Sequence, residues 1–180
     1  MTGTVVDSGE CITSAFPVYE GTINKHAVKS IPFGGRDITD YIKKQLALEP
    51  DHEINMSHYG QNQVFRRMKQ ELCYCGEPRD VPETEYKLPD GETICVSDVE
   101  ETFPFRAPEF FFFDPGRLDW DEDSTGISEE SVQQMIFKSL MDCSIDTRKK
   151  LTENIILCGS NTLFDGLPEM MYKKLKTEVT

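Results

Sequence analysis

The sequence lacks the features that would place the protein in a membrane, on a secretory route or on nucleic acid. No apolar run approaches the roughly 18 residues that a transmembrane helix needs. The segment Met1 to Gly9 has neither the basic start nor the long apolar stretch of a signal peptide. Lysines and arginines number 19 against 32 aspartates and glutamates and form no cluster, which disfavours contacts with phosphate backbones and anionic membrane surfaces.

Cysteine is present, but its arrangement indicates neither a metal site nor a disulfide framework. The six cysteines are scattered, and most stand among apolar residues. Cys73 and Cys75 form the only close pair, and no second pair of cysteines or histidines accompanies them. We therefore expect buried, reduced thiols in a cytosolic or nuclear protein, and no zinc site.

The remaining composition is ordinary for a soluble globular protein. The chain has 180 residues, 38% hydrophobic and 28% charged, which is enough for a core in one domain or two small ones. The net charge of −13 favours solubility and basic partners. Strands at the start, helices in the middle and a strand, glycine turn and helix at the end predict an α/β or mixed α+β fold.

Several strands can be predicted from residue type. Strand-like segments at 4–6 and 12–19 flank the turn residues Asp7-Ser8-Gly9-Glu10, and a third strand-like run at 27–33 ends at Gly34-Gly35. A hairpin is expected at 86–96, turned at Pro89-Asp90-Gly91. The segment 154–157 predicts a short buried strand.

Four segments have the spacing of amphipathic helices. They are 37–48, about 61–73, a helix with the apolar stripe Val132, Met135, Ile136, Ser139 and Leu140, and about 167–177. The aromatic run Phe110 to Phe113 is expected in the core, and the acidic segment Asp119 to Asp123 is expected to be solvated.

A series of short motifs stands in the order and approximate spacing of one known family. The motifs are Thr2 to Glu10, Pro17 to Gly21, His26-Ala27, Gly34 to Tyr41, Lys69 to Tyr74, Tyr86 with Leu88 to Gly91, Phe105 to Glu109, Asp146 to Lys149, and Asn154 to Leu163 with Gly166. Over almost its whole length, the chain resembles the actin family of actins and actin-related proteins.

The resemblance implies a partial actin-like ATPase fold. The family has two RNase-H-like lobes, with ATP or ADP and Mg²⁺ or Ca²⁺ in the cleft between them. This chain resembles the second lobe, formed by residues 1–42 and 97–180, with a helical subdomain inserted at 43–96. The first lobe, and the final strand and helices of the second lobe, have no counterpart in the sequence.

The resemblance also implies a set of nucleotide-binding residues. On the phosphate side these are Ser8, Gly9 and Glu10 of a phosphate-binding hairpin, while Asp7 would hold the cation through water. On the purine side they are Arg66, Lys69, Gln70, Gly159, Ser160, Asn161 and Phe164. From the residues alone, other interpretations stay open: Asp-Ser-Gly forms a plain β-turn, Gly159 ends a strand, and Lys69 lies on a solvated helix face.

Several positions depart from the family pattern. Cys11 and Ser160 replace glycines, and a side chain at Cys11 would cost about 1 kcal/mol if that position required a positive φ. Ser14 replaces a histidine that helps to organise the attacking water. Gln70 replaces a glutamate, and Glu10 replaces an aspartate.

Three functions remain open. The first is a cytoskeletal actin-like or actin-related protein that forms one wall of an ATP-binding cleft and does not hydrolyse ATP alone. The second is an interaction or scaffold subunit without nucleotide, and the third is an ATPase completed by another chain. We expect actin-like subunits or actin-binding proteins as partners, in the cytoplasmic cytoskeleton or, for an actin-related protein, the nucleus. A missing edge strand would expose apolar surface, so we also expect the chain to need a partner or the missing lobe.

Overall fold

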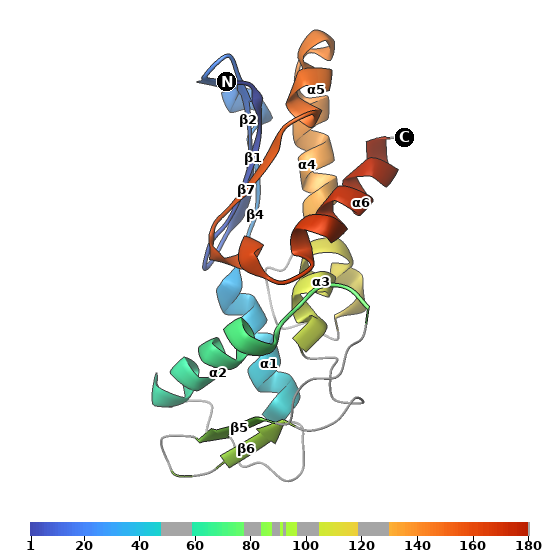
Figure 1. Cartoon of the computed structure of the whole chain (residues 1–180). Helices are drawn as coiled ribbons and strands as arrows, with labels where there is room; N and C mark the ends of the chain where they lie inside the picture. The colour runs from blue at the N-terminus through green and yellow to red at the C-terminus, as the bar shows by residue number, and fades with distance from the viewer. Residues whose placement is uncertain are drawn as a thin grey trace.

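The computed structural model describes residues 1–47, 59–77, 84–87, 91, 93–96, 105–118 and 130–179, which form a five-stranded sheet, a two-stranded sheet and several helices (Figure 1). The strands are β1 (Gly3–Ser8), β2 (Thr13–Tyr19), β3 (Thr22–Ile23), β4 (Lys29–Ile31), β5 (Thr84–Lys87), β6 (Thr93–Val96) and β7 (Ile155–Cys158). The helices are α1 (Gly35–Ala47), α2 (Tyr59–Leu72), α3 (Ala107–Phe113), α4 (Val132–Met141), α5 (Ile145–Thr152) and α6 (Leu167–Val179). The mixed α/β class is therefore confirmed.

The five-stranded sheet joins the two ends of the chain. β1 and β2 form an antiparallel hairpin, and β3 and β4 both pair with β2. On the other side of β1, β7 pairs in parallel, with Thr4 opposite Ile155 and Asp7 opposite Cys158. Because parallel strands end at the same edge of a sheet, the turn after β1 and the turn after β7 lie next to each other.

Helices α4, α5 and α6 lie on one side of this sheet (Figure 1). α4 packs on β2 and β4, α5 packs on β1 and β2, and α6 packs on α4. The predicted stripe of α4 is buried, and the Ser139 hydroxyl donates to the Ala27 carbonyl at 2.6 Å. Ser131 and Gln134 form a capping box that begins the helix, which supplies partners for amides that the helix leaves unpaired.

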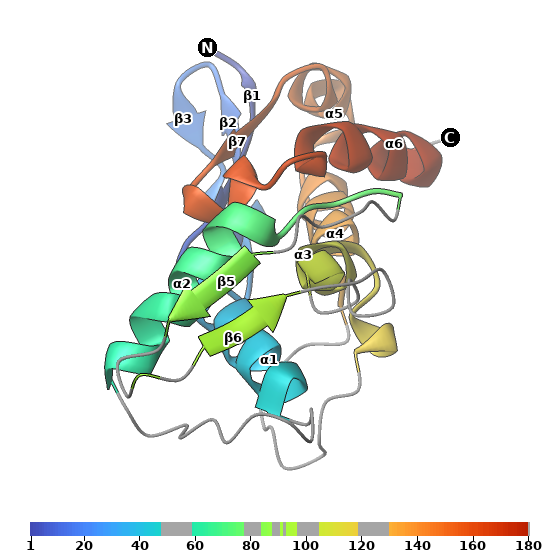
Figure 2. The ribbon, with the colours of Figure 1, turned by 60° about the horizontal axis from the view of Figure 1, so that its bottom comes forward.

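An aromatic core connects the sheet with α1 and α3. The Phe33 and Phe111 rings stack at 5.0 Å, and the Tyr41 ring meets Phe111 edge-on at 5.7 Å, both within the range that favours aromatic pairs. All four residues of Phe110 to Phe113 are buried, which confirms that the run is core. Helix α2 packs against α1, and the β5–β6 hairpin lies at the end of the molecule away from the five-stranded sheet (Figure 1), in front of these two helices in Figure 2.

The predicted strands and helices are present with shifts of a few residues, and some details differ. The short helices α3 and α5 were not predicted. In α5, Leu151 is the only buried residue, which leaves no apolar stripe. The strand at the end of the chain is not buried, since β7 is an edge strand and Ile156 is 47% exposed. The β5–β6 pairing confirms the hairpin at 86–96, while Pro89, Asp90 and the acidic segment 119–123 lie outside the described residues.

The cysteines differ in burial. Cys73, Cys75 and Cys143 are buried as predicted, whereas Cys158 is half-buried and Cys11 is exposed. Burial raises the pKa of the Cys75 thiol to about 12, so this thiol is protonated at neutral pH. In the described ranges, no group of histidine, cysteine, aspartate and glutamate is arranged to hold a metal ion, and no helix is long and apolar enough to cross a membrane.

Candidate functional site

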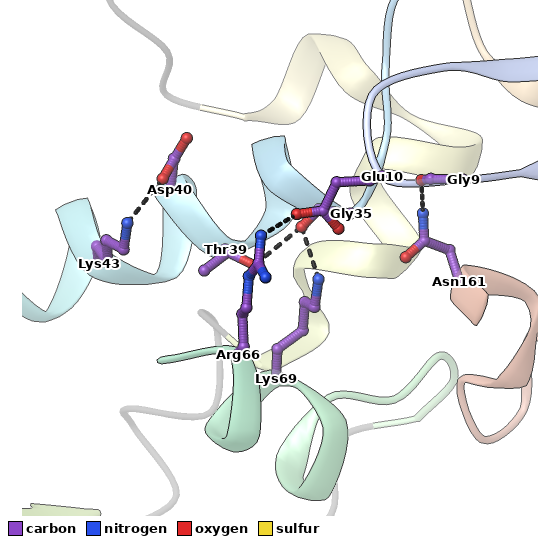
Figure 3. Close-up of polar contacts among 9 residues, drawn as sticks. All are labelled: Gly9, Glu10, Gly35, Thr39, Asp40, Lys43, Arg66, Lys69 and Asn161. Atoms are coloured by element: carbon purple, nitrogen blue, oxygen red, sulfur yellow. Dashed lines mark hydrogen bonds and ion pairs between the residues drawn. The ribbon is translucent and has the colours of Figure 1, made fainter. Parts of the chain in front are cut away.

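The turn between β1 and β2 holds two other segments of the chain in place (Figure 3). The Gly9 carbonyl accepts hydrogen bonds from the Gly35 amide at 3.0 Å and from Asn161 Nδ2 at 2.6 Å. The Glu10 carbonyl accepts from the Arg36 amide at 2.8 Å. The turn therefore anchors both the start of α1 and the 3-10 helix Ser160–Leu163 that follows β7.

Two glycines permit this close approach. Gly159 has φ of 87°, and a Cβ there would collide with the Ser8 carbonyl. A Cβ on Gly35 would lie 2.6 Å from Asn161 Oδ1 and 2.9 Å from Lys69 Nζ. The missing side chain at Gly35 is thus the space into which Lys69 and Asn161 reach.

Helix α2 contributes two basic residues to the same place. Lys69 is 6% exposed, and its ammonium group donates to the Gly35 carbonyl at 2.7 Å. Burial lowers the pKa of Lys69, and the nearby Glu10 carboxylate opposes this shift in part. Arg66 pairs with Glu10 at 2.5 Å, but both side chains are about half exposed, so the pair contributes at most about 1 kcal/mol.

The Ser8 hydroxyl is fully buried beneath the turn and already has partners. Thr13 Oγ1 donates to the Phe33 carbonyl at 2.9 Å, so the 2.8 Å contact between Ser8 and Thr13 has Ser8 as the donor. Asn161 Nδ2 donates to the Ser8 hydroxyl at 3.2 Å. Ser8, Thr13 and Asn161 therefore form a buried polar floor under the turn.

The structure brings most of the predicted residues together. Ser8, Gly9, Glu10, Arg66, Lys69 and Asn161 are linked by hydrogen bonds or an ion pair, directly or through Gly35. Gly159 packs on Ser8, and Asp7 is exposed beside it. Gln70 and Ser160 are also exposed, and Phe164 lies in the core; in the part of the chain that is described, none of these three bonds to the linked residues.

Sequence reasoning missed Gly35 and Thr13 as parts of the site. The Gly35 carbonyl accepts hydrogen bonds from Lys69 and from Thr39, yet the sequence indicates only the end of a strand-like run and part of the motif Gly34 to Tyr41. The sequence gives one indication of this role, which is the position of Gly34-Gly35 directly before a predicted helix. Glycines at a helix start often allow a close approach to the backbone amides there.

The exposed tip of the turn has the donors that an anion needs. Among the described residues, the backbone amides of Glu10 and Cys11 make no hydrogen bond. The Asp7 carboxylate, exposed at the end of β1, is a ligand type that a hydrated Mg²⁺ or Ca²⁺ accepts. The residues present therefore fit an anion with a hydrated cation beside the turn.

Two departures from the family pattern acquire a structural meaning. Cys11 does not have a positive φ, so the backbone strain considered for its side chain does not arise. Ser14 is 7% exposed, and its hydroxyl lies 2.9 Å from that of Ser30 on β4. Its hydroxyl is therefore engaged with the neighbouring strand.

The fold and this site define a mixed α/β protein in which a hairpin turn, a helix start and a glycine turn converge. Comparison with known families gives a match to the family model described as Actin, over residues 1–180. The chain belongs to the actin family, and its fold is consistent with a partial actin-like fold. Members of this family generally bind a nucleotide with a divalent cation and are typically cytoplasmic.

Proposed function

We propose that this actin-like chain forms one wall of an ATP-binding cleft, in a cytoskeletal protein or an actin-related subunit. The observation that carries the proposal is the convergence at the β1–β2 turn, where the Glu10 and Cys11 amides face no partner among the described residues. A bound nucleotide with Mg²⁺ or Ca²⁺ would supply the phosphate groups and the cation charge at this turn.

Each predicted residue then has a distinct task. Ser8, Gly9 and Glu10 form the phosphate-binding turn, in which the free amides meet phosphate oxygens and the buried Ser8 hydroxyl supports the backbone. Asp7 holds the cation through water. The purine side is formed by Arg66, Lys69, Gln70, Gly159, Ser160, Asn161 and Phe164.

In this proposal the chain binds ATP and does not hydrolyse it alone. Positioning of the attacking water dominates phosphoryl transfer, and Ser14 replaces the family's histidine with a short side chain bonded to Ser30. A second wall would shield the opposite side of the nucleotide from water, which strengthens electrostatic contacts made to the phosphates.

A second candidate is an interaction or scaffold subunit that binds no nucleotide. The observation that favours it is that Lys69 and Asn161 already pair with backbone carbonyls, and Ser8 with Thr13. Polar groups that satisfy one another have less to gain from a ligand. The two candidates differ in one measurable property, which is the affinity for an adenine nucleotide.

The proposal also includes the expected organisation and setting. Residues 1–42 and 97–180 would form the lobe, and 43–96 the inserted subdomain. The position of the β5–β6 hairpin, at the end of the molecule away from the five-stranded sheet, supports this division (Figure 1). Actin-like subunits or actin-binding proteins would be the partners, in the cytoplasmic cytoskeleton.

A titration of the purified chain with a fluorescent ATP analogue and Mg²⁺ tests the proposal. We expect saturable binding that Arg66→Gln weakens and that Arg67→Gln leaves unchanged, because Arg67 pairs with Glu71 one turn along the same helix and not with the β1–β2 turn in the described part of the chain. Loss of one exposed cationic contact corresponds to about a tenfold change in affinity. Absence of saturable binding by the folded chain would favour the scaffold subunit.

A further inference from the structure

Two successive peptide units at the tip of the β1–β2 turn have the same orientation. The Gly9 carbonyl accepts from the Gly35 amide, and the Glu10 carbonyl accepts from the Arg36 amide, so both carbonyls point toward the start of α1. The described part of the chain contains no cis peptide bond. In a planar trans peptide the N–H points opposite to the C=O. The amides of Glu10 and Cys11 therefore point to the same side, away from α1.

A buried side chain fixes the first of these peptide units (Figure 3). Asn161 is 3% exposed, and its Nδ2 donates to the Gly9 carbonyl at 2.6 Å and to the Ser8 hydroxyl at 3.2 Å. Together with the Gly35 amide, Asn161 thus occupies both lone pairs of the Gly9 carbonyl. Because an asparagine side chain has two N–H groups, these two bonds leave it no donor for a ligand.

The second peptide unit is fixed by close packing. A Cβ on Gly34 would collide with the carbonyl group of Glu10 and with the nitrogen of Cys11, at nearly equal distances from the three atoms. Gly34 therefore lies over the face of this peptide unit. The Gly34 amide donates to the Asp37 carboxylate at 2.8 Å, which holds Gly34 at the start of α1. The Cys11 N–H lies in the plane of the unit, so this packing does not cover it.

We propose that Asn161 is a positioning residue of the phosphate-binding turn. It holds the Glu10 amide toward a bound anion, beside the Cys11 amide, and does not touch the nucleotide. Successive backbone N–H groups on one side form a concavity that suits the oxygens of a phosphate group. This inference rests on the proposed nucleotide site, and it moves Asn161 within that site from the purine side to the phosphate side.

A direct contact between Asn161 and the purine fits the observations less well. Besides the two N–H groups, the polar atom of the Asn161 side chain is Oδ1. A Cβ on Gly35 would lie 2.6 Å from this oxygen, so Oδ1 is directed at the backbone of α1. A side chain that is 3% exposed also offers little surface to a base.

The loss of the Asn161 side chain should therefore affect the phosphates and not the base. In Asn161→Ala the Gly9 carbonyl keeps one partner, and the conformational freedom of glycine lets the Gly9–Glu10 peptide unit rotate. The Glu10 amide is then no longer held toward the anion. Binding to the full chain is titrated with ATP and with inorganic pyrophosphate, both in the presence of Mg²⁺. We expect both dissociation constants to rise by the same factor of about ten.

Ser139→Ala is the matched control for these titrations. It also removes a buried hydrogen bond to a backbone carbonyl, that of Ala27, but outside the β1–β2 turn, and it should bind both ligands normally. Weaker binding of ATP with unchanged binding of pyrophosphate would place Asn161 at the purine. Unchanged binding of both ligands by Asn161→Ala would give this side chain a structural role only. Either result would overturn the proposal.

NMR of the wild-type chain decides the question if Asn161→Ala does not fold. Pyrophosphate should shift the amide resonances of Glu10 and Cys11, and the side-chain NH₂ resonances of Asn161 should be the same with ATP as with pyrophosphate. A shift of the Asn161 resonances with ATP alone would overturn the proposal. If pyrophosphate binds at the turn and ATP does not bind, the role of Asn161 stands and the proposed ATP-binding function fails. If neither ligand binds, both fail.

Discussion

Lys69 is the residue through which α2 reaches the first turn of α1. Replacing it with methionine removes the bond to the Gly35 carbonyl, which keeps the bond from Thr39 at 2.9 Å. Because the Gly35 carbonyl keeps one hydrogen-bond partner, we expect the free energy of unfolding, measured by urea titration, to fall by only about 1 kcal/mol. Lys173→Met, which removes an exposed lysine from α6, is the control and should have no comparable effect.

The lowered pKa of Lys69 adds a pH dependence to this comparison. Burial disfavours the charged form in the folded state, so the unfolded chain binds more protons as pH approaches the ordinary lysine pKa. The contribution of Lys69 to the free energy of unfolding therefore becomes more favourable as the pH rises to about 10.5. The wild-type chain should gain stability relative to Lys69→Met as the pH rises toward the ordinary lysine pKa of about 10.5. A stability difference between the two proteins that stays constant or shrinks as the pH rises would contradict a lowered pKa of Lys69.

Asn161 holds the polar floor to the hairpin turn. Asn161→Ala removes the bonds to Gly9 and Ser8 from a side chain that is 3% exposed. We expect a loss of about 2 kcal/mol in the free energy of unfolding, because buried polar groups lose a partner. Ser160→Ala, exposed and adjacent, should stay within about 0.5 kcal/mol of the wild type. Equal effects of the two substitutions would show that the Asn161 bonds are not stabilising.

Phe111 on α3 joins that helix to α1 and to the segment between β4 and α1. Its ring is 2% exposed, stacks on Phe33 and meets Tyr41 edge-on. Phe111→Ala should lower the free energy of unfolding by about 3–5 kcal/mol, measured by denaturant titration. Phe137→Ala on α4, where the side chain is only partly buried, is the matched control and should cost clearly less. If Phe111→Ala cost no more than Phe137→Ala, α3 would not be an essential part of this core.

The helices show what periodicity can and cannot predict. α4 was predictable because Val132, Met135, Ile136 and Leu140 repeat at helical spacing, and all are buried. α5 has one buried residue, so its sequence carries no period to detect. β7 is a short apolar run, which has the same appearance in a central strand and in an edge strand. Its exposure depends on which strands pair beside it.

The site was predictable as a set of residues but not as a geometry. The motif around Asp7 to Glu10 and the glycine turn at Gly159 could be recognised from order and residue type. Their contact depends on the parallel pairing of β1 with β7, which local sequence does not encode. For the same reason, the roles of Gly35 and Thr13 became clear only when Lys69 and Ser8 were seen to bond to them.

The whole chain carries a net charge of −13, which opposes compactness through self-repulsion. Moderate salt screens this repulsion over about 8–10 Å at physiological ionic strength. We therefore expect the thermal midpoint to rise as sodium chloride increases from low concentration to about 0.15 M. A fall over this range would mean that ion pairs such as Glu10–Arg66 stabilise the fold more than the net charge destabilises it.

Thermal unfolding of the purified chain with and without ATP and Mg²⁺ tests the proposed cleft wall most directly. A ligand that binds only the native state stabilises it by about 2.7 kcal/mol at a hundredfold excess over its dissociation constant. For a chain of this length, we expect the midpoint to rise by about 5–10 °C at that excess. A cooperative transition with an unchanged midpoint would contradict nucleotide binding at the β1–β2 turn and favour the scaffold subunit.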